Sequence, residues 1–197
     1  MPRQVTAKLT DALDKHVLGI LKENEKRIKE INTPFNPIKG EGCGDKRFLL
    51  FLPDFPIQRQ QLPVSMKKIP LVKMLIEFGS CKAVIEELHK DIDETYNIEE
   101  EMEQLVEQFT RIRMKHDPFF FFATFIYIKP KGGGLPFRFV LRRPQRRLLR
   151  WLEERRKKHR PIRLILLKAR QWGGSTVIQM YFLWLQLMLQ KGLNSLI

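Results

Sequence analysis

The segment from Leu167 to Val177, LKARQWGGSTV, combines cations, adjacent glycines and hydroxyl side chains between two apolar runs. The run from Ile162 to Leu167 has the length of a strand buried on both faces of a parallel sheet. The apolar residues that begin at Val177 have helical length. A loop between a strand and a helix can direct its amides and the free N–H groups of the helix start at one anion. The segment therefore predicts a phosphate-binding turn.

The standard phosphate-loop pattern, G-x-x-x-x-G-K-[ST], is half met in this segment. Gly173 and Ser175 occupy their expected positions, whereas Gly174 stands in place of the lysine and Lys168 in place of the first glycine. Phosphate charge needs a cation, which Lys168 at the start of the loop or Arg170 within it could supply. The alternative is a tight strand-to-helix turn that binds no ligand.

A strongly basic segment lies just upstream, with the sequence RRPQRRLLRWLEERRKKHR. Its leucines and its tryptophan fall on one side, which predicts an amphipathic helix with Pro144 at its start. Such a helix could lie along a phosphate backbone, where each neutralised phosphate releases counterions. The candidate nucleic-acid contacts are Arg146, Arg147, Arg155 and Arg156. The helix could equally pack its apolar side on a sheet and leave these cations solvated.

A net charge of +14 is the main compositional signal of the 197-residue chain. Residues 111 to 170 contain 19 of the 36 Lys and Arg residues but only 3 of the 22 acidic residues. A basic field concentrated in one segment favours a polyanionic partner, and nucleic acid and nucleotides both qualify. The alternative is a solvated basic face that only maintains solubility.

The overall composition is typical of a globular protein. Apolar residues make up 43% and charged residues 29% of the chain, which argues against a disordered or a membrane protein. The longest apolar run, near Val177 to Leu189, is interrupted by two glutamines and is shorter than the roughly 20 residues that span a bilayer. We therefore expect a buried helix there and no membrane partner. Cys43 and Cys81 are predicted to be reduced, structural thiols.

Local patterns predict two helices and a strand before residue 117. Apolar residues at steps of three, four and seven form one stripe from Leu9 to Ile31, which predicts a helix that ends at Asn32 to Pro34. A second helix is predicted from the N-cap residue Asn97 to about Lys115. The run from Arg47 to Leu52 is a candidate short strand.

The dipeptide Asp117-Pro118 ends the second predicted helix, and the charge of the chain changes abruptly at the same point. We therefore predict a domain boundary between residues 1–116 and 117–197. The aromatic run from Phe119 to Phe122 is predicted to lie in a core, with a base-stacking platform as the alternative.

Two segments resemble motifs of one family. The stretch LLKARQWGGST resembles the deviant Walker A loop of the large terminase subunits of tailed phages, in which the lysine can stand at the beginning of the loop. The upstream stretch PFRFVLRRPQRRLL resembles the adenine-contacting segment of the same family, in which a glutamine follows a strand and precedes a helix. The similarity covers about residues 117 to 190. Residues 1–116 resemble only the variable N-terminal region of the family.

This resemblance implies a role for individual residues in binding ATP and Mg²⁺. Gln145 would contact adenine, Lys168 would offset phosphate charge, and Arg170 would sense the γ-phosphate as the catalytic residue. The remaining cofactor-binding residues would be Gly173 and Gly174, which let the backbone close on phosphate, Ser175, which ligates Mg²⁺, and Thr176, which contacts an adjacent phosphate.

The resemblance also implies the fold class. We expect an α/β protein with a mostly helical N-terminal region over residues 1–116, followed by the start of a P-loop NTPase parallel-sheet domain over residues 117–197. In the family a second strand carries an acidic residue for Mg²⁺, and a nuclease domain follows. Neither is found before Ile197. We therefore expect ATPase activity in a full-length parent and little hydrolysis by this chain alone.

Large terminase subunits are ATP-driven motors that package double-stranded DNA into the procapsid and cut it. The resemblance therefore implies double-stranded DNA, a portal protein and a small terminase subunit as partners, a homo-oligomeric ring, and the cytoplasm of a bacterial host as the location. Two other functions stay open. One is a basic nucleic-acid-binding protein without nucleotide chemistry, and the other is a different P-loop ATPase such as a helicase-like enzyme.

Overall fold

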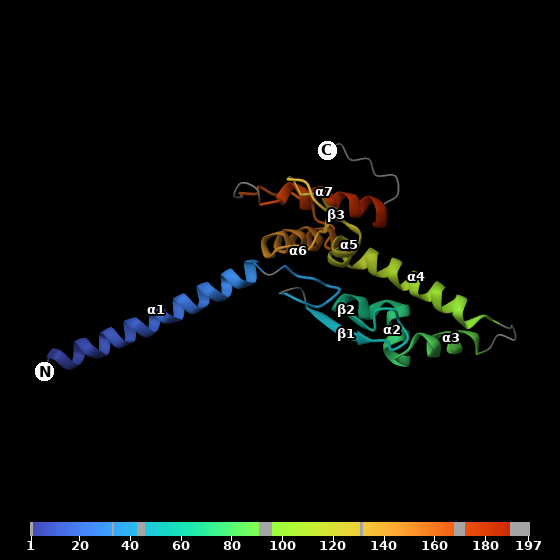
Figure 1. Cartoon of the computed structure of the whole chain (residues 1–197), viewed down its shortest axis with the longest axis horizontal. Coiled ribbons are helices and arrows are strands. Elements are labelled where there is room, and N and C mark those ends of the chain that lie inside the picture. Colours follow the sequence, from blue (N-terminus) through green and yellow to red (C-terminus); the bar gives the residue numbers. More distant parts are fainter. Residues whose placement is uncertain are drawn as a thin grey trace.

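The computed structural model describes residues 2–32, 34–42, 46–90, 96–130, 132–167 and 172–189, with the side chains of the first helix described from residue 13 to residue 29. Over these residues the chain is mixed helical and sheet, as expected. Figure 1 shows a long first helix that projects from a body made of the remaining elements. The elements are α1 (Pro2–Asn32), β1 (Arg47–Phe51), β2 (Arg59–Pro63), η1 (Val64–Lys68), α2 (Pro70–Phe78), α3 (Cys81–His89), α4 (Ile98–His116), α5 (Pro118–Phe125), β3 (Tyr127–Ile128), β4 (Phe137–Arg138), α6 (Arg143–Lys157), α7 (Gly174–Trp184) and η2 (Leu185–Leu189).

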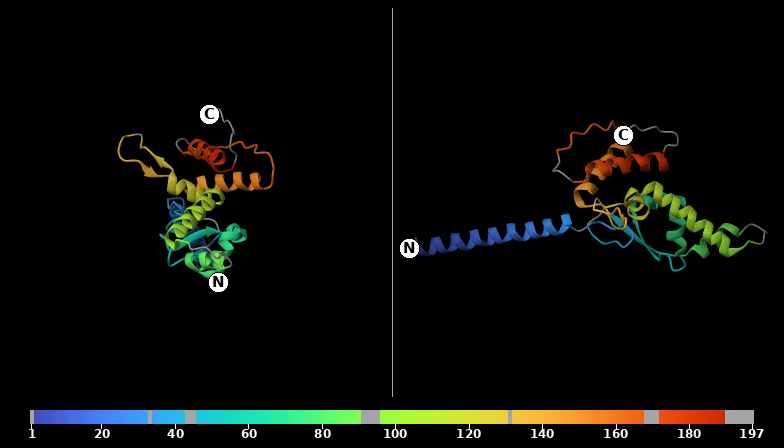
Figure 2. Two further views of the ribbon diagram at one scale, coloured as in Figure 1. Left: turned by 90° about the vertical axis from the view of Figure 1, so that its right-hand side faces the viewer. Right: turned by 45° about the horizontal axis from the view of Figure 1, so that its top comes forward.

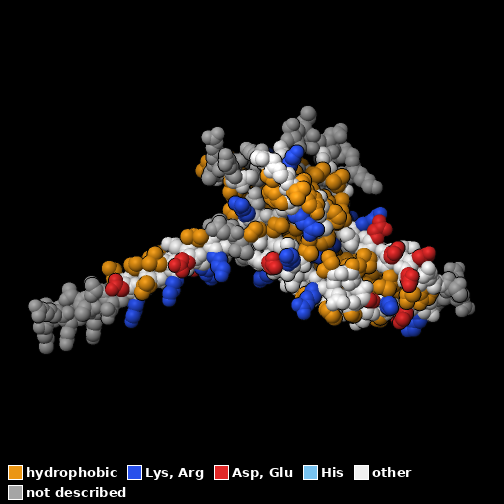
Figure 3. All heavy atoms as spheres, in the orientation of Figure 1, with side chains coloured by type: hydrophobic (Ala, Val, Ile, Leu, Met, Phe, Trp, Pro, Cys, Tyr) orange, Lys and Arg blue, Asp and Glu red, His pale blue; other side chains and the backbone are white. Residues whose placement is uncertain are grey.

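Helix α1 confirms the helix predicted from the apolar stripe, and it ends at the predicted position. Its described side chains are all exposed. Leu13, Leu18 and Ile28 are 63%, 55% and 58% exposed. Among the described residues, the apolar stripe of α1 therefore packs against neither hydrophobic core. In Figure 3 apolar side chains follow one side of α1 and Lys and Arg side chains lie along the opposite side.

One hydrophobic core forms around a β-hairpin and three helices. Strand β1 pairs antiparallel with β2, in a register that places Arg47 opposite Pro63. The predicted strand at residue 47 is therefore confirmed. Helix α4 also follows the prediction, since the side chain of Asn97 accepts a hydrogen bond from the backbone N–H of Glu99 at 3.1 Å. The apolar residues buried in this hairpin core are Leu50, Leu52, Phe55, Leu62, Met66, Val72, Leu75, Cys81, Val84, Ile85, Leu105 and Phe109.

The side chain of Cys81 is fully buried in the hairpin core. Burial, together with the negative charge of Asp54, raises the pKa of the Cys81 thiol to about 12. Cys81 is a free cysteine, as predicted. Cys43 lies outside the described residues.

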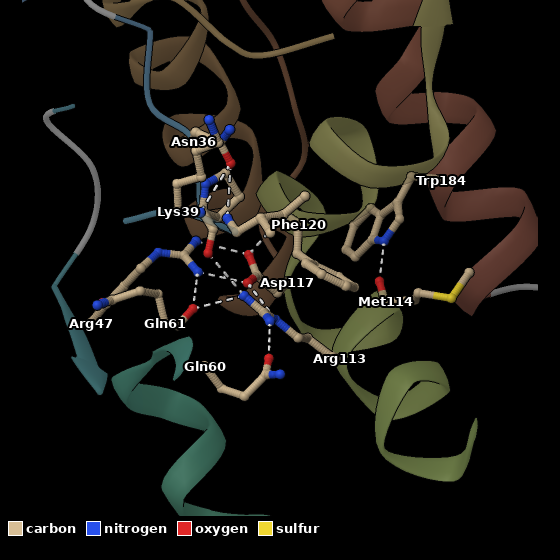
Figure 4. Close-up of polar contacts among 12 residues, drawn as sticks. Asn36, Lys39, Arg47, Gln60, Gln61, Arg113, Met114, Asp117, Phe120 and Trp184 are labelled. Atoms are coloured by element: carbon tan, nitrogen blue, oxygen red, sulfur yellow. Dashed lines mark hydrogen bonds and ion pairs between the residues drawn. The ribbon is translucent and has the colours of Figure 1, made fainter. Parts of the chain in front are cut away.

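A second core forms where α5, α6 and α7 pack together. Phe119, Phe121 and Phe122 of α5 are buried there, and Phe120 is buried as well, so the predicted core role of Phe119 to Phe122 is confirmed. Trp184 ties α7 to the end of α4, because its indole Nε1 donates to the carbonyl oxygen of Met114 at 2.8 Å (Figure 4). The residues buried in this helical core are Phe35, Phe119, Phe121, Phe122, Phe139, Leu141, Leu148, Leu149, Leu152, Val177, Tyr181 and Trp184.

The predicted boundary at Asp117 lies between the two cores, where a buried polar network connects them (Figure 4). The guanidinium of Arg113 donates to the side chain of Gln60, to the backbone oxygen of Gln61 at 2.9 Å and to that of Pro37 at 3.1 Å. Burial, with the like charge of Arg47, lowers the pKa of Arg113 to about 10 although the carboxylate of Asp117 opposes this shift. This junction therefore holds two buried guanidinium groups and one buried carboxylate.

No parallel sheet is present among the described residues, which contain two two-stranded antiparallel sheets. The run from Ile162 to Leu167, predicted to be a buried strand, has no strand pairing. Ile165 and Leu167 are 91% and 94% exposed. The strand prediction is wrong in this structure because burial of both faces needs neighbouring strands, and the described part of the chain places none beside this run. In Figure 2 this segment crosses from α6 back to α7 outside the helices, and the β3–β4 hairpin projects from the body.

Candidate functional site

The two glycines of the motif mark the start of α7. Gly173 has φ of +77° and caps α7, whose first residue is Gly174. A left-handed φ strains any residue with a Cβ atom, so glycine is the favoured residue here. The backbone N–H of Val177 donates to the carbonyl oxygen of Gly173 at 3.1 Å, which closes the first turn of the helix. The predicted helix after the glycines is therefore confirmed.

Gln145 contacts this turn from α6, although 27 residues separate it from Trp172 along the chain. Its amide Nε2 lies 3.4 Å from the carbonyl oxygen of Trp172, and its Oε1 accepts from the backbone N–H of Arg142 at 3.0 Å. A Cβ atom on Gly173 would lie 2.8 Å from the same Nε2. The buried side chain of Gln145 therefore packs directly against the glycine turn.

The other predicted ligands occupy the first turn of α7. Gly174 is buried beneath Trp172, since a Cβ atom there would lie 2.4 Å from Cζ3 of the indole. Ser175 is exposed and Thr176 is half-buried. The structure thus brings five of the predicted residues together at the α7 N-terminus, namely Gln145, Gly173, Gly174, Ser175 and Thr176. Lys168 and Arg170, the two predicted countercharges, lie outside the described residues.

The four arginines predicted to contact nucleic acid do not share one surface of α6. Arg146 is 1% exposed, and its guanidinium donates to the carbonyl oxygen of Leu141 at 2.9 Å. The structure therefore places Arg146 in the interior, where a phosphate backbone does not reach it. Arg147 is exposed, and Arg155 lies over the ring of Trp151 at 5.2 Å.

Arg156 is half-buried and belongs to a polar cluster that the sequence reasoning missed. Two hydrogen bonds of 2.7 and 2.9 Å join its guanidinium to the carboxylate of Glu153, which also accepts from the Tyr181 hydroxyl at 2.9 Å. Burial, with the nearby charge of Glu153, raises the pKa of Tyr181 above its ordinary value. Since 28 residues separate Glu153 from Tyr181, no local pattern could have predicted this pair.

A cavity of about 660 Å³ opens beside the glycine turn. It is lined by the C-terminal third of α1, by the face of α6 from Arg143 to Trp151, and by Leu164, Leu166 and Trp172. Its described charged lining consists of Glu23 and Arg27 from α1, with Arg143 and Arg147 from α6. Sequence reasoning missed this cavity as well, because it depends on how α1 meets α6.

The described residues contain no group of three or more His, Cys, Asp or Glu side chains arranged to hold a metal ion. Among the described helices, none combines the length and apolarity that a membrane crossing requires. No protein-family model, curated protein or solved structure matches this chain.

Proposed function

We propose that the turn before α7 binds the phosphates of ATP, and that the chain is the nucleotide-binding front of a DNA-packaging motor similar to the large terminase subunits. Double-stranded DNA, a portal protein, a small terminase subunit, a ring of identical subunits and a bacterial cytoplasmic location are parts of the same proposal. The parallel sheet of a P-loop domain also belongs to it.

The contact between Gln145 and the glycine turn carries this proposal. The adenine-contacting segment and the phosphate-binding turn must lie side by side to hold one nucleotide. The 3.4 Å contact from Gln145 Nε2 to the Trp172 carbonyl oxygen brings the two segments together. Neither the amphipathic pattern of α6 nor the glycine pair requires this proximity.

The residues of the turn would have different roles in binding the phosphates. The backbone N–H groups at the start of α7 would donate to a phosphate placed at the helix N-terminus. Gly173 lets the backbone reach φ of +77°, which orients the amides of the turn. Lys168 would supply the phosphate countercharge, and Arg170 would act on the γ-phosphate.

The donor set for Mg²⁺ is incomplete among the described residues. Ser175 is exposed in the first turn of α7, where its hydroxyl could be one ligand. With no carboxylate cluster in the described part of the chain, the other ligands would be nucleotide phosphates and water. Mg²⁺ bound this way would neutralise phosphate charge, and the chain's own residues would position the nucleotide.

The proposal is tested by the affinity of the chain for a fluorescent ATP analogue with Mg²⁺. The Lys168→Ala variant should bind about 10-fold to 100-fold more weakly, since a charge-assisted contact contributes about 1.5–3 kcal/mol. Gly132→Ala is the matched control, because a Cβ atom there meets nothing within 4 Å. Equal affinity of Lys168→Ala and the unmodified chain removes the proposal.

A second function is favoured by the exposed cations of α6. Arg147, Arg150 and Lys157 are exposed on this helix, and a nucleic-acid-binding protein without nucleotide chemistry would use them. This function predicts a steep salt dependence of DNA binding that ATP does not change. DNA affinity measured at several salt concentrations, with and without ATP, distinguishes the two functions.

A further inference from the structure

The β3–β4 hairpin projects from the body of the protein (Figure 2). Its base is held in place, because the backbone N–H of Phe139 donates to the carbonyl oxygen of Ile126 at 2.9 Å. Ile126 and Ile128 also pack against the helical core. Beyond these contacts, residues 132–138 are all exposed. The hairpin is therefore anchored at its base and reaches into solvent at its tip.

The tip of the hairpin, residues 132–136, is narrow and apolar. Its first three residues are glycines, which carry no side chains. The backbone N–H of Gly133 donates to the carbonyl oxygen of Pro130 at 3.2 Å, which tightens the turn. Leu135 follows the glycines and is 89% exposed, and Pro136 fixes the backbone next to it. Leu135 belongs to neither core of the described chain, so its apolar surface is open to a partner.

The charge around the hairpin suits a polyanion. The 35 residues from Pro118 to Leu152 contain eight Lys and Arg residues and no acidic residue. Lys129 is exposed just after β3, and Arg138 is exposed in β4, opposite Tyr127. Nε of Arg138 donates to the Tyr127 hydroxyl at 3.2 Å, which orients the guanidinium along the hairpin. Because this segment carries no carboxylate, its positive field matches a nucleic-acid backbone better than a protein surface of mixed charge.

We propose that the β3–β4 hairpin enters the minor groove of double-stranded DNA, with Leu135 as a wedge between two base pairs and with Lys129 and Arg138 near the flanking phosphates. The inference rests on the DNA partner of the proposed function and names the surface that holds it.

This surface differs from the nucleotide site. None of the described residues from 127 to 138 lines the cavity beside the glycine turn. Strand β4 begins the stretch that resembles the adenine-contacting segment, but the residue of that stretch whose side chain hydrogen-bonds to the glycine turn is Gln145 of α6. DNA on the hairpin and ATP at the turn would therefore occupy separate places.

The shape of the tip favours the minor groove. This groove is only about 6 Å wide in B-DNA, so it admits thin elements most easily. The glycines of the tip are the thinnest residues available, and Leu135 and Pro136 follow them directly. Leucine and proline are among the side chains that insert between base steps from the minor groove, which kinks the duplex by about 20–90°. The hairpin should therefore bend the DNA that it binds.

The first test uses the full chain and a duplex of about 25 base pairs that carries a fluorophore at each end. Energy transfer between the ends reports bending, and anisotropy reports affinity. Leu135→Ala should remove most of the change in energy transfer but weaken binding less than about 3-fold, because phosphate contacts supply most of the affinity. Leu88→Ala is the matched control, since Leu88 is an exposed leucine on α3, and it should retain the bend.

The second test removes a cation of the hairpin. Lys129→Gln should weaken binding about 3-fold to 10-fold on any sequence and lower the slope of log affinity against log salt by about 1. Lys82→Gln, at an exposed position on α3, is the matched control and should leave the slope unchanged. The minor-groove ligand netropsin should displace the chain, whereas methyl green in the major groove should not. Circular dichroism verifies that each variant is folded.

Loss of the bend in Leu135→Ala alone supports the proposal. Absence of DNA binding overturns it, and so does binding without a bend, a bend that Leu135→Ala retains, or displacement by methyl green only. Equal salt slopes of Lys129→Gln and Lys82→Gln also overturn it. If Leu135→Ala changes the sedimentation of the chain and leaves DNA binding unchanged, the tip contacts protein instead, which overturns the proposal.

The affinity of the same variants for the ATP analogue separates this proposal from the proposed function. Leu135→Ala should bind the analogue as the unmodified chain does. A bend that does not depend on the hairpin, together with loss of the analogue in Lys168→Ala, overturns the hairpin alone. Equal analogue affinity of Lys168→Ala, together with a bend that depends on Leu135, overturns the ATP turn alone.

Discussion

The carboxylate of Asp117 accepts two hydrogen bonds from the guanidinium of Arg47, at 2.6 Å from Nη1 to Oδ2 and at 2.8 Å from Nη2 to Oδ1. The side chains are 0% and 4% exposed. Arg47 begins β1, whereas Asp117 caps α5 by accepting from the backbone N–H of Phe120 at 3.2 Å. This pair therefore connects the hairpin core to the helical core. Arg113 approaches the same carboxylate at 3.6 Å, so one acid faces two buried cations.

Replacement of Asp117 by alanine should destabilise the protein by about 3–5 kcal/mol, because both arginines would be left buried without a counter-ion. Urea unfolding, followed by circular dichroism, measures this change. Glu107→Ala is the control, because it breaks only the exposed pair with Arg111. That pair should contribute less than about 1 kcal/mol. Similar losses in the two variants would show that the buried junction contributes no special stability.

Replacement of Gly173 by alanine should destabilise the protein by about 1–3 kcal/mol through the left-handed backbone, with an added cost from the contact with Gln145. The control is Gly133→Ala. Gly133 has a similar φ of +83°, but a Cβ atom there meets nothing within 4 Å. The difference between the two unfolding free energies measures the contact alone. Equal losses would mean that Gln145 moves away at no cost.

Asp54 should make stability depend on acidic pH. Burial alone would raise the pKa of Asp54, but backbone hydrogen bonds from Cys81 at 3.0 Å and Lys82 at 2.8 Å outweigh it, so the pKa lies below its ordinary value of 3.8. Such a group stabilises the fold fully above that ordinary value, and its contribution is lost as the pH falls through the lower folded-state pKa.

Asp54→Asn should therefore flatten the loss of stability between about pH 5 and pH 2. Unfolding free energies measured in urea at a series of pH values check this expectation. Glu86→Gln, at an exposed position on α3, should retain the acid dependence of the unmodified chain. An unchanged acid dependence in Asp54→Asn would contradict the role of this carboxylate at the start of α3.

Helices with local signals could be predicted from the sequence. Apolar periodicity predicts α1, and Asn97 predicts the start of α4. Pro144 and the apolar side of the following residues predict α6. Each of these signals lies within a few turns of one helix, so no tertiary information is needed.

The two prolines between residues 57 and 80, Pro63 and Pro70, both mark the ends of elements rather than breaks within them. Pro63 ends β2 and precedes η1, and Pro70 occupies the first turn of α2, where its missing N–H costs nothing. The packing of the hairpin core determines which proline begins a helix, so the local sequence alone does not predict it.

The strand predicted at Ile162 to Leu167 is absent from the structure, although its residues are apolar. Apolar composition measures what a segment could bury, and burial also requires a surface that covers it. Arg146, predicted to contact nucleic acid, is buried for a related reason. Its charge suggests a solvent face, but it is spaced three residues from Leu149 and seven from Glu153, both of which are buried in α6. Helical spacing therefore could have predicted its position.

The length of α1 has a geometric consequence. A helix of 31 residues is roughly 46 Å long at about 1.5 Å per residue. A tilt of about 10° at its attachment beside α6 would sweep the distant end through roughly 8 Å. A small change in the direction of α1 beside α6 would therefore move the distant end of the helix by several ångströms.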